Sequence, residues 1–205
     1  MPEPTSDRPW GEAHRNNLVG AQVDAGPVLI RDMRWTDIED AHHIEQQSFA
    51  VDVWSLETFW SELAGVPERR RYLVAVVPAL PVGVGQPVGQ EIVGYAGLAF
   101  SGSECDVQTI VVAPAARGRG IGERLLVELL ATGQRLGCER CHLEVSSDNH
   151  AAEALYRRHG FQPVSRRIGY YGGAADAVTM QATLSAPLPP AGDRFGEVPM
   201  DQGGP

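Results

Sequence analysis

The sequence predicts an α/β protein built as one domain around a central sheet. Its 205 residues suit one domain with a substantial core, and 43% hydrophobic with 21% charged residues is ordinary for a globular chain. Short β-like runs alternate with amphipathic helical runs, and capping residues and glycines separate them. The predicted order is β-α-α-β-β-β-α-β-α-β-β, so we expect helices packed against a sheet.

Each element is predicted from its periodicity and its end signals. Thr36-Asp37-Ile38-Glu39 is typical of a capping box that opens the first helix. Ser55 and Asn149 are predicted N-caps of two later helices. The predicted elements are strand 28–33, helix 37–49, a short helix from Ser55 to Gly65, strands 72–77, 91–100 and 107–112, helix 121–136 closed by Gly137, strand 141–145, helix 149–159 closed by Gly160, and strands 161–171 and 177–184.

The two ends of the chain and one internal insert lack these patterns. Residues 1–26 and 187–205 are rich in Gly, Pro and acidic residues, so we expect disordered tails around a domain that spans 27–186. Residues 78–90 are rich in Pro and Gly and are predicted to form a long hairpin loop.

Composition excludes several classes of function. The chain contains no lysine, which excludes Schiff-base cofactor chemistry. Its formal net charge of −9 argues against direct binding to nucleic acid and favours a cationic partner. The longest apolar run, 72–84, is broken by Pro78 and Pro81 and is too short to span a membrane. Because the N-terminal segment is polar and acidic, we expect a cytoplasmic protein without a membrane anchor.

Three cysteines, Cys105, Cys138 and Cys141, cannot all pair internally and suggest reduced thiols. The run Cys138-Glu139-Arg140-Cys141-His142 matches the c-type haem attachment motif, but the chain shows no export signal. A thioredoxin-type pair would open a helix, whereas these residues follow one. We therefore interpret the cysteines as small buried side chains of the βα framework.

The most informative stretch is the loop Ala116-Arg117-Gly118-Arg119-Gly120-Ile121-Gly122, between a predicted strand and a predicted helix. Alternating glycines let the backbone approach an anion closely and direct free amides at it, where the helix dipole is positive. A Walker loop needs lysine and then serine or threonine after its last glycine, but Glu123 and Arg124 follow Gly122. The glycine spacing also differs from the dinucleotide fingerprint G-x-G-x-x-G. The loop predicts a pyrophosphate site.

This loop resembles the R/Q-x-x-G-x-G/A motif of the GNAT superfamily of acyl-CoA N-acyltransferases, with Arg117, Gly120 and Gly122 at the defining positions. Residues 143–161, LEVSSDNHAAEALYRRHGF, resemble one branch of that superfamily, the bacterial ribosomal-protein-alanine N-acetyltransferases of the RimI type. The resemblance covers roughly residues 28 to 184. It implies a mixed, mostly antiparallel sheet with helices on both faces, splayed at the acyl-CoA site.

The resemblance also implies acetyl-CoA as co-substrate and no metal. Ile110 to Val112 would offer backbone groups to the pantetheine, and the loop amides would hold the pyrophosphate. The cofactor-binding residues expected on this basis are Ile110, Val111, Val112, Arg117, Gly118, Arg119, Gly120, Ile121, Gly122, Glu123 and Asn149. His42 and His43 are adjacent and splay apart on a helix, so they show no metal-ligand spacing.

Acetyl transfer to an amine needs a deprotonated nucleophile and a protonated leaving thiol, so one base and one acid are expected. Glu144 lies at the carboxyl end of a predicted strand, where α/β sheets bind ligands, and is the candidate base. From position alone it fits a solvated strand face equally well. Tyr156 resembles the general acid of the family, although a packed aromatic would also explain it. Helix capping alone would likewise explain Asn149.

The expected substrate is the N-terminal alanine of a small-subunit ribosomal protein, whose basic tail would suit an acidic enzyme. Tyr170 resembles an aromatic residue near the acceptor, and Phe49 and Trp54 would wall the acceptor groove. Two alternatives stay open: a GNAT enzyme that acetylates lysine side chains or small amines, and a non-catalytic acetyl-CoA-binding module. A nicotinamide oxidoreductase disagrees with the glycine spacing.

Overall fold

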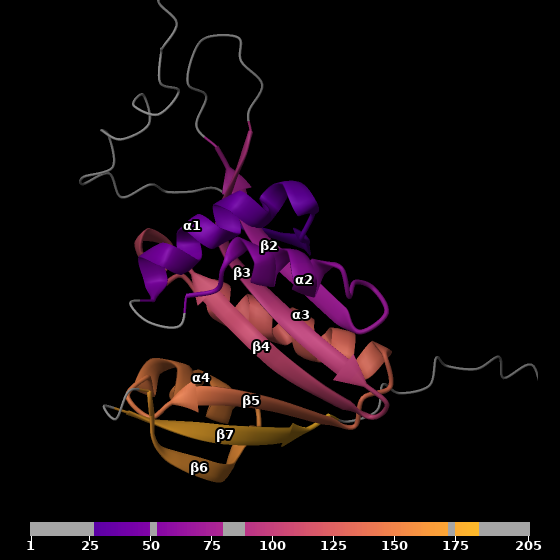
Figure 1. Cartoon of the computed structure of the whole chain (residues 1–205), viewed down its shortest axis with the longest axis vertical. Helices are drawn as coiled ribbons and strands as arrows, with labels where there is room; N and C mark the ends of the chain where they lie inside the picture. The colour runs from indigo at the N-terminus through magenta and orange to yellow at the C-terminus, as the bar shows by residue number, and fades with distance from the viewer. Residues whose placement is uncertain (1–26, 50–52, 80–88, 172–174, 185–205) are drawn as a thin grey trace, which may run out of the picture.

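The computed structural model describes residues 27–49, 53–79, 89–171 and 175–184, which form one mixed sheet flanked by helices (Figure 1). The predicted tails and most of the predicted hairpin loop (80–88) lie outside the described residues. The elements follow the predicted order. They are β1 Leu29–Asp32, α1 Ile38–Ser48, α2 Leu56–Leu63, β2 Arg70–Pro78, β3 Gln90–Ser101, β4 Glu104–Val112, α3 Ile121–Arg135, β5 Arg140–Ser146, α4 His150–Arg158, β6 Gln162–Tyr171 and β7 Ala175–Thr183.

The seven described strands form one sheet in the order β1-β2-β3-β4-β5-β7-β6. Every neighbouring pair is antiparallel except β4 and β5, which run parallel because α3 carries the chain back between them. The mixed, mostly antiparallel sheet implied by the resemblance is confirmed. β5 pairs with β4 on one side and with β7 on the other. The β4–β5 pair therefore joins the group of strands β1 to β4 to the group β5, β7 and β6.

Helices cover both faces of the sheet, each over its own apolar core. Ile38, Ala41, Ile44 and Phe59 of α1 and α2 pack over Tyr72 and Tyr95 on one face. The fully buried leucines of α3 pack on the other face with Phe161 and Met180; these leucines are Leu125, Leu126 and Leu129. Leu136, the last residue of the predicted helix, is the C-cap of α3 and is 48% exposed.

Most of the predicted helix ends are confirmed. Ser55 and Asn149 accept hydrogen bonds from the backbone amides of Thr58 and Ala152, and Gly137 and Gly160 take positive φ where α3 and α4 end. The capping box from Thr36 to Glu39 is wrong. A short 3₁₀ turn, Trp35–Asp37, precedes α1, and the carboxylate of Asp37 accepts the backbone amide of Arg34 instead.

Candidate active site

The site begins where β4 and β5 stop pairing. Their ladder joins Glu104 with Arg140 through to Val107 with Leu143, but β4 continues to Val112 and β5 to Ser146. Figure 1 shows the two strands diverging beyond the paired part. Beyond Val107, therefore, the β4 edge toward β5 has backbone groups that no described strand pairs with. This is the splay that the resemblance implied.

A β-bulge on β4 accompanies the divergence. Gly97 pairs with Thr109 and Leu98 with Val107, so Gln108 is the extra residue. The Tyr72 hydroxyl oxygen lies 2.7 Å from the Gln108 side-chain oxygen and 3.0 Å from a Glu62 carboxylate oxygen, and its proton is donated within this group. A Cβ added at Gly97 would lie 2.3 Å from the Tyr72 ring, so only glycine lets the ring pack there. A bulge bends its strand and increases its twist, which is how we explain the turn of β4 away from β5.

The glycine loop lies between β4 and α3, where the sequence predicts it. Gly118 and Gly120 have φ of 76° and 74°, in the left-handed region that disfavours other residues, and Gly120 is the N-cap of α3. A Cβ at either position would meet no atom of the described residues within 4 Å, so those residues leave the space beside the loop open. The first amides of a helix have no partner inside it, and here they belong to Ile121, Gly122 and Glu123. The loop therefore fits a pyrophosphate group.

Two arginines that flank the glycines, Arg117 and Arg124, bind different parts of the backbone. Arg117 donates to the Val112 carbonyl over 3.1 Å, which ties the loop to the end of β4. Arg124 donates to the Val28 carbonyl over 2.8 Å, so it braces the residue just before β1. The Glu123 carboxylate accepts from His159 over 2.9 Å and thereby joins α3 to α4. Only the Glu123 amide, not its side chain, is available to an anion.

A cavity of about 400 Å³ opens in the diverging region. It brings together Ile110, Glu144, Asn149 and Tyr156, four of the residues singled out in the sequence. Phe49 and Trp54 also line it, as expected for the groove walls. Val111 is buried in the core beneath α1, and Val112 packs against the other core, so only their backbones could meet a ligand at the β4 edge.

Tyr156 projects from α4 into this cavity. Its ring is 8% exposed and packs edge-on against Phe161 with centroids 5.9 Å apart. Its hydroxyl has no hydrogen bond to any described residue. Burial raises the pKa of this phenol to about 12. The group thus stays protonated and can donate a hydrogen bond into the cavity.

Glu144 lines the same cavity from β5. Its neighbours Leu143 and Val145 are buried on the opposite face, as strand alternation predicts. Its carboxylate forms an ion pair with Arg167 of β6, and the Arg167 guanidinium lies 3.9 Å from the centroid of the Tyr170 ring. Tyr170 itself is 50% exposed and is not among the residues that line the cavity; it contacts Arg167, which pairs with Glu144.

Asn149 caps α4 and also lines the cavity. Its side-chain oxygen accepts a hydrogen bond from the Ala152 amide over 3.1 Å, so capping accounts for the oxygen of the carboxamide. The amide nitrogen of the same side chain has no described partner and can donate to a ligand.

One candidate functional residue, Glu45, was not predicted from the sequence. Glu45 of α1 is 2% exposed and lines the cavity. Its carboxylate accepts the Tyr95 hydroxyl over 2.5 Å and the Trp54 backbone amide over 3.1 Å. It therefore fixes the segment before α2 against the cavity wall. The signal was present, because Glu45 follows Ile38 and Ala41 on the buried face at helical spacing.

The three cysteines are free and buried, as interpreted from the sequence. Within the described ranges, no three His, Cys, Asp or Glu side chains gather as metal ligands. No helix in that part of the chain has both the length and the apolar composition needed to cross a bilayer.

Comparisons with known proteins agree with this geometry. The family model described as Acetyltransferase (GNAT) family matches residues 38–161. The chain is 40% identical over 173 residues to N-alpha-acetyltransferase RimI of Mycobacterium tuberculosis, covering 80% of this chain and 98% of that protein. It is 30% identical over 159 residues to the [ribosomal protein bS18]-alanine N-acetyltransferase of Escherichia coli, covering 76% of this chain and 97% of the relative.

A solved structure gives the same answer for the fold. The crystal structure of the ribosomal-protein-S18-alanine N-acetyltransferase from Escherichia coli superposes with a TM-score of 0.65 at 28% identity, covering 83% of this chain and all of that one. The fold and the site define an acyltransferase built on a splayed α/β sheet. The chain belongs to the GNAT family of acetyltransferases, and within it to the N-acetyltransferases of the RimI type.

Proposed function

We propose that this protein transfers an acetyl group from acetyl-CoA to the N-terminal α-amine of a protein, specifically the N-terminal alanine of a small-subunit ribosomal protein. One observation carries the proposal: Glu144 and Tyr156 line one cavity at the point where the sheet opens. The names of the relatives from Escherichia coli support the choice of substrate. Such a substrate implies a cytoplasmic enzyme.

Acetyl-CoA would lie along the diverging strands. The amides from Gly118 to Glu123 would hold the pyrophosphate, with Arg117 and Arg119 beside them. The unpaired β4 edge from Ile110 to Val112 would hydrogen-bond the pantetheine, and the Asn149 amide nitrogen would donate to it from the opposite wall. The bound co-substrate supplies the thioester that the amine attacks.

Glu144 would accept a proton from the acceptor ammonium, directly or through water. An α-amine with a pKa near 8 is about one-tenth neutral at pH 7, whereas a lysine amine near 10.4 is below about one in a thousand. A single carboxylate base therefore suits an N-terminal substrate. Because Arg167 holds the same carboxylate, the incoming ammonium would replace a cation that is already there.

Tyr156 would stabilise the leaving group. As the amine nitrogen bonds to the carbonyl carbon, the carbon–sulfur bond breaks and negative charge develops on the sulfur. With a pKa near 12, the phenol is a weaker acid than a thiol at about 8.5, so it donates a strong hydrogen bond and the thiolate takes its proton from solvent.

Intact-mass measurement with acetyl-CoA and two matched peptides tests this function. One peptide has a free N-terminal alanine and no lysine, and the other has a blocked N-terminus and one internal lysine. We expect the mass of one acetyl group to be added to the first peptide only. Modification of the lysine peptide alone would replace the proposal with a lysine acetyltransferase. Retained binding of acetyl-CoA without turnover of either peptide would favour the binding module.

A further inference from the structure

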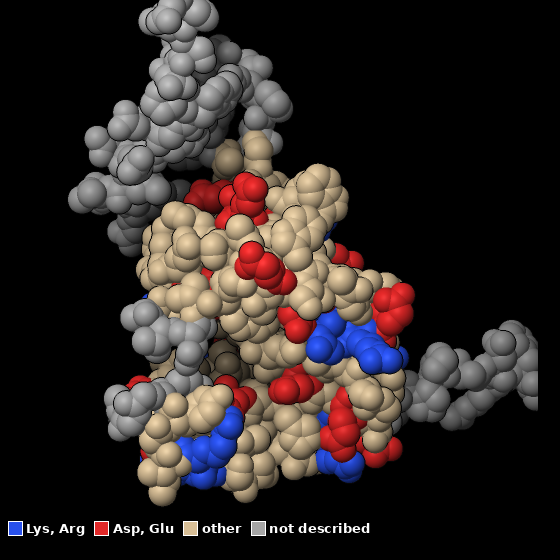
Figure 2. All heavy atoms as spheres, in the orientation of Figure 1, with Lys and Arg blue, Asp and Glu red and all other residues tan. Residues whose placement is uncertain are grey.

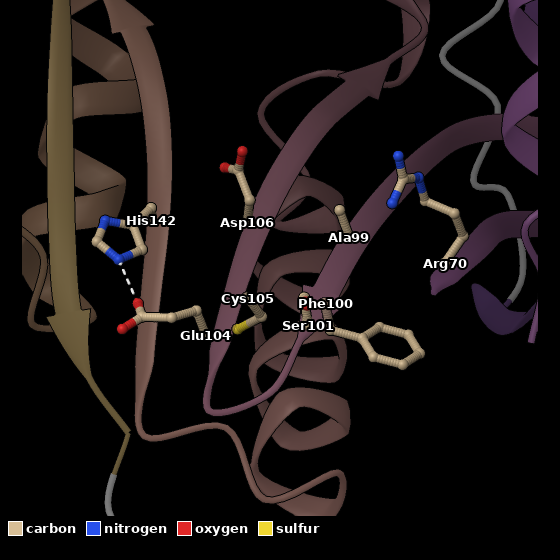
Figure 3. A pocket seen from close by; sticks show the side chains of 8 residues that line it. All are labelled: Arg70, Ala99, Phe100, Ser101, Glu104, Cys105, Asp106 and His142. Atoms are coloured by element: carbon tan, nitrogen blue, oxygen red, sulfur yellow. Dashed lines mark hydrogen bonds and ion pairs between the residues drawn. The ribbon is translucent and has the colours of Figure 1, made fainter. Parts of the chain in front are cut away.

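A second cavity lies at the other end of the β4–β5 junction, where the strands are still paired. It measures about 260 Å³. Its walls come from the ends of β2, β3, β4 and β5, and Figure 3 shows the side chains that line it: Arg70, Ala99, Phe100, Ser101, Glu104, Cys105, Asp106 and His142. None of these residues has a part in the proposed acetyl transfer.

The charged groups of this cavity are satisfied except for one. Glu104 accepts from Arg140 over 2.7 Å and pairs with His142 over 2.7 Å. Arg70, on the opposite wall, is held by Glu62 over 2.5 Å. Asp106 has no hydrogen bond or ion pair with any described residue, and Figure 3 shows its carboxylate projecting from β4. Asp106 is exposed. Desolvation by the surrounding side chains and the Glu144 charge raise its pKa, while the charges of His142 and Arg70 act in the opposite direction.

The Asp106 carboxylate lies on the same face of the sheet as Glu144 of the proposed active site, further along the β4–β5 pair. Asp106 pairs in register with His142, and Glu144 follows two residues later on the same face of β5. At about 3.3 Å per residue, the two carboxylates are separated by about 7 Å along the strands. Because side chains alternate along a strand, this register places Asp106 and Glu144 on the same face of the sheet. Figure 2 shows this face hollowed, with acidic side chains along the hollow.

We propose that the acceptor polypeptide runs from Glu144 along the β4–β5 junction, and that the second cavity binds a positively charged side chain of the second or third residue of that polypeptide, counted from the acetylated one. This inference rests on the proposed function and adds the chemistry of its substrate. An extended chain advances about 3.3 Å per residue, so the second or third residue lies level with Asp106. An arginine or lysine there would donate a charge-assisted hydrogen bond to Asp106, which has no direct hydrogen-bond partner among the described residues and is influenced by Arg70 and His142 only at longer range.

Asp106 is thus a specificity residue for the acceptor. It does not touch the reacting atoms, and its distance from Glu144 leaves the chemistry of the amine unaltered. A charge-assisted hydrogen bond is stronger than a neutral one, so the preference is measurable.

The test compares two alanine-initiated peptides that differ at the third position, arginine in one and glutamine in the other. We expect the wild-type enzyme to prefer the arginine peptide about tenfold in kcat/KM. In Asp106→Asn the ratio of the two kcat/KM values should fall below about twofold. The control Glu91→Gln loses the same charge at the far end of β3 and should keep the wild-type ratio. Matching peptides with the change at the second position locate the contact.

The outcomes separate the two proposals. If neither peptide gains an N-terminal acetyl group, the proposed function fails. If both are acetylated and the preference for arginine is absent, or survives in Asp106→Asn, the cationic subsite is wrong while the proposed function stands. A fall for both peptides by the same factor would assign Asp106 to the chemistry at Glu144 and would also overturn the subsite.

Discussion

The two halves of the β4–β5 junction are built from the same pair of strands and behave in opposite ways. In the closed half, Glu104 to Val107 pair with Arg140 to Leu143, and Glu104 fastens the strands by binding both Arg140 and His142. In the open half, Gln108 to Val112 leave their edge toward β5 unpaired, and the cavity with Glu144 and Tyr156 occupies the gap. The site lies where regular pairing ends.

The difference shows how a sheet supplies both rigidity and recognition. A closed ladder satisfies its backbone groups internally and holds the strands in register. An open edge presents the same groups to a ligand, which can complete the ladder. The bulge at Gln108, fixed by the Tyr72 hydroxyl, marks the boundary. Variants at Glu144 and Tyr156 alter the open half, Gly97→Ala alters the boundary, and Gly120→Ala alters the loop that follows β4.

The largest effect is expected from Glu144→Gln in the open half. Loss of a general base typically costs 10²-fold to 10⁴-fold, so kcat/KM for an alanine-initiated peptide should fall at least about 100-fold. The ion pair with Arg167 is exposed, so unfolding free energy should change by less than about 1 kcal/mol. Steady-state kinetics and denaturant melts check both. Glu128→Gln on α3, which also loses an exposed ion pair, is the control and should keep activity within about twofold. Equal kinetics for the two variants would remove Glu144 from the mechanism.

The boundary is broken by Gly97→Ala. The added methyl group would overlap the buried Tyr72 ring and force it away from Gln108, at a cost of about 2 to 3 kcal/mol of unfolding free energy. Urea denaturation measures the loss. Gly89→Ala, whose Cβ would meet Ala79 at an ordinary 3.7 Å and no other described residue within 4 Å, should stay within about 0.5 kcal/mol of the wild type. If both variants are equally stable, Tyr72 does not fix the bulge.

A smaller effect is expected in the glycine loop. Gly120→Ala forces a side chain into positive φ, and we expect the KM for acetyl-CoA to rise about tenfold with a loss of about 1 kcal/mol in stability. Gly122→Ala, within the first turn of α3, adds a Cβ at an ordinary 3.7 Å from Val112 and should preserve the KM within about twofold. Identical KM values for the two variants would disprove the loop as the pyrophosphate site.

The smallest effect concerns Tyr156 and alkaline pH. Its pKa is about 12 in the folded protein and about 10 in the unfolded chain, so the unfolded state loses the phenol proton first. Stability present below pH 10 is then lost as pH rises toward 12. Between pH 9 and pH 11 the unfolding free energy of Tyr156→Phe should fall by about 1 kcal/mol less than that of the wild type. Denaturant melts at the two pH values measure this difference. The other buried tyrosines are common to both proteins. Parallel pH profiles would mean that the phenol is not desolvated.

Local signals were enough to predict the order of the elements and the capping by Ser55 and Asn149, because these depend on neighbours in sequence. The capping box at Thr36 failed because a 3₁₀ turn placed Asp37 nearer the Arg34 amide. Glu144 and Tyr156 could be named, but not their common cavity, which depends on how far β4 and β5 pair. The ion pair between Arg167 and Glu144, and the place of Asp106 in the second cavity, depend on contacts between distant parts of the chain. No local sequence pattern predicts them.

Amide hydrogen exchange along β4, with and without coenzyme A, tests the central claim most directly. If the open half binds the acyl carrier, amides within 108–112 that face the unpaired edge should exchange at least about tenfold more slowly when it is bound, while those of 104–107 keep their rates. Equal protection of both halves, or none at saturating coenzyme A, would contradict an acyl-CoA site between the diverging strands.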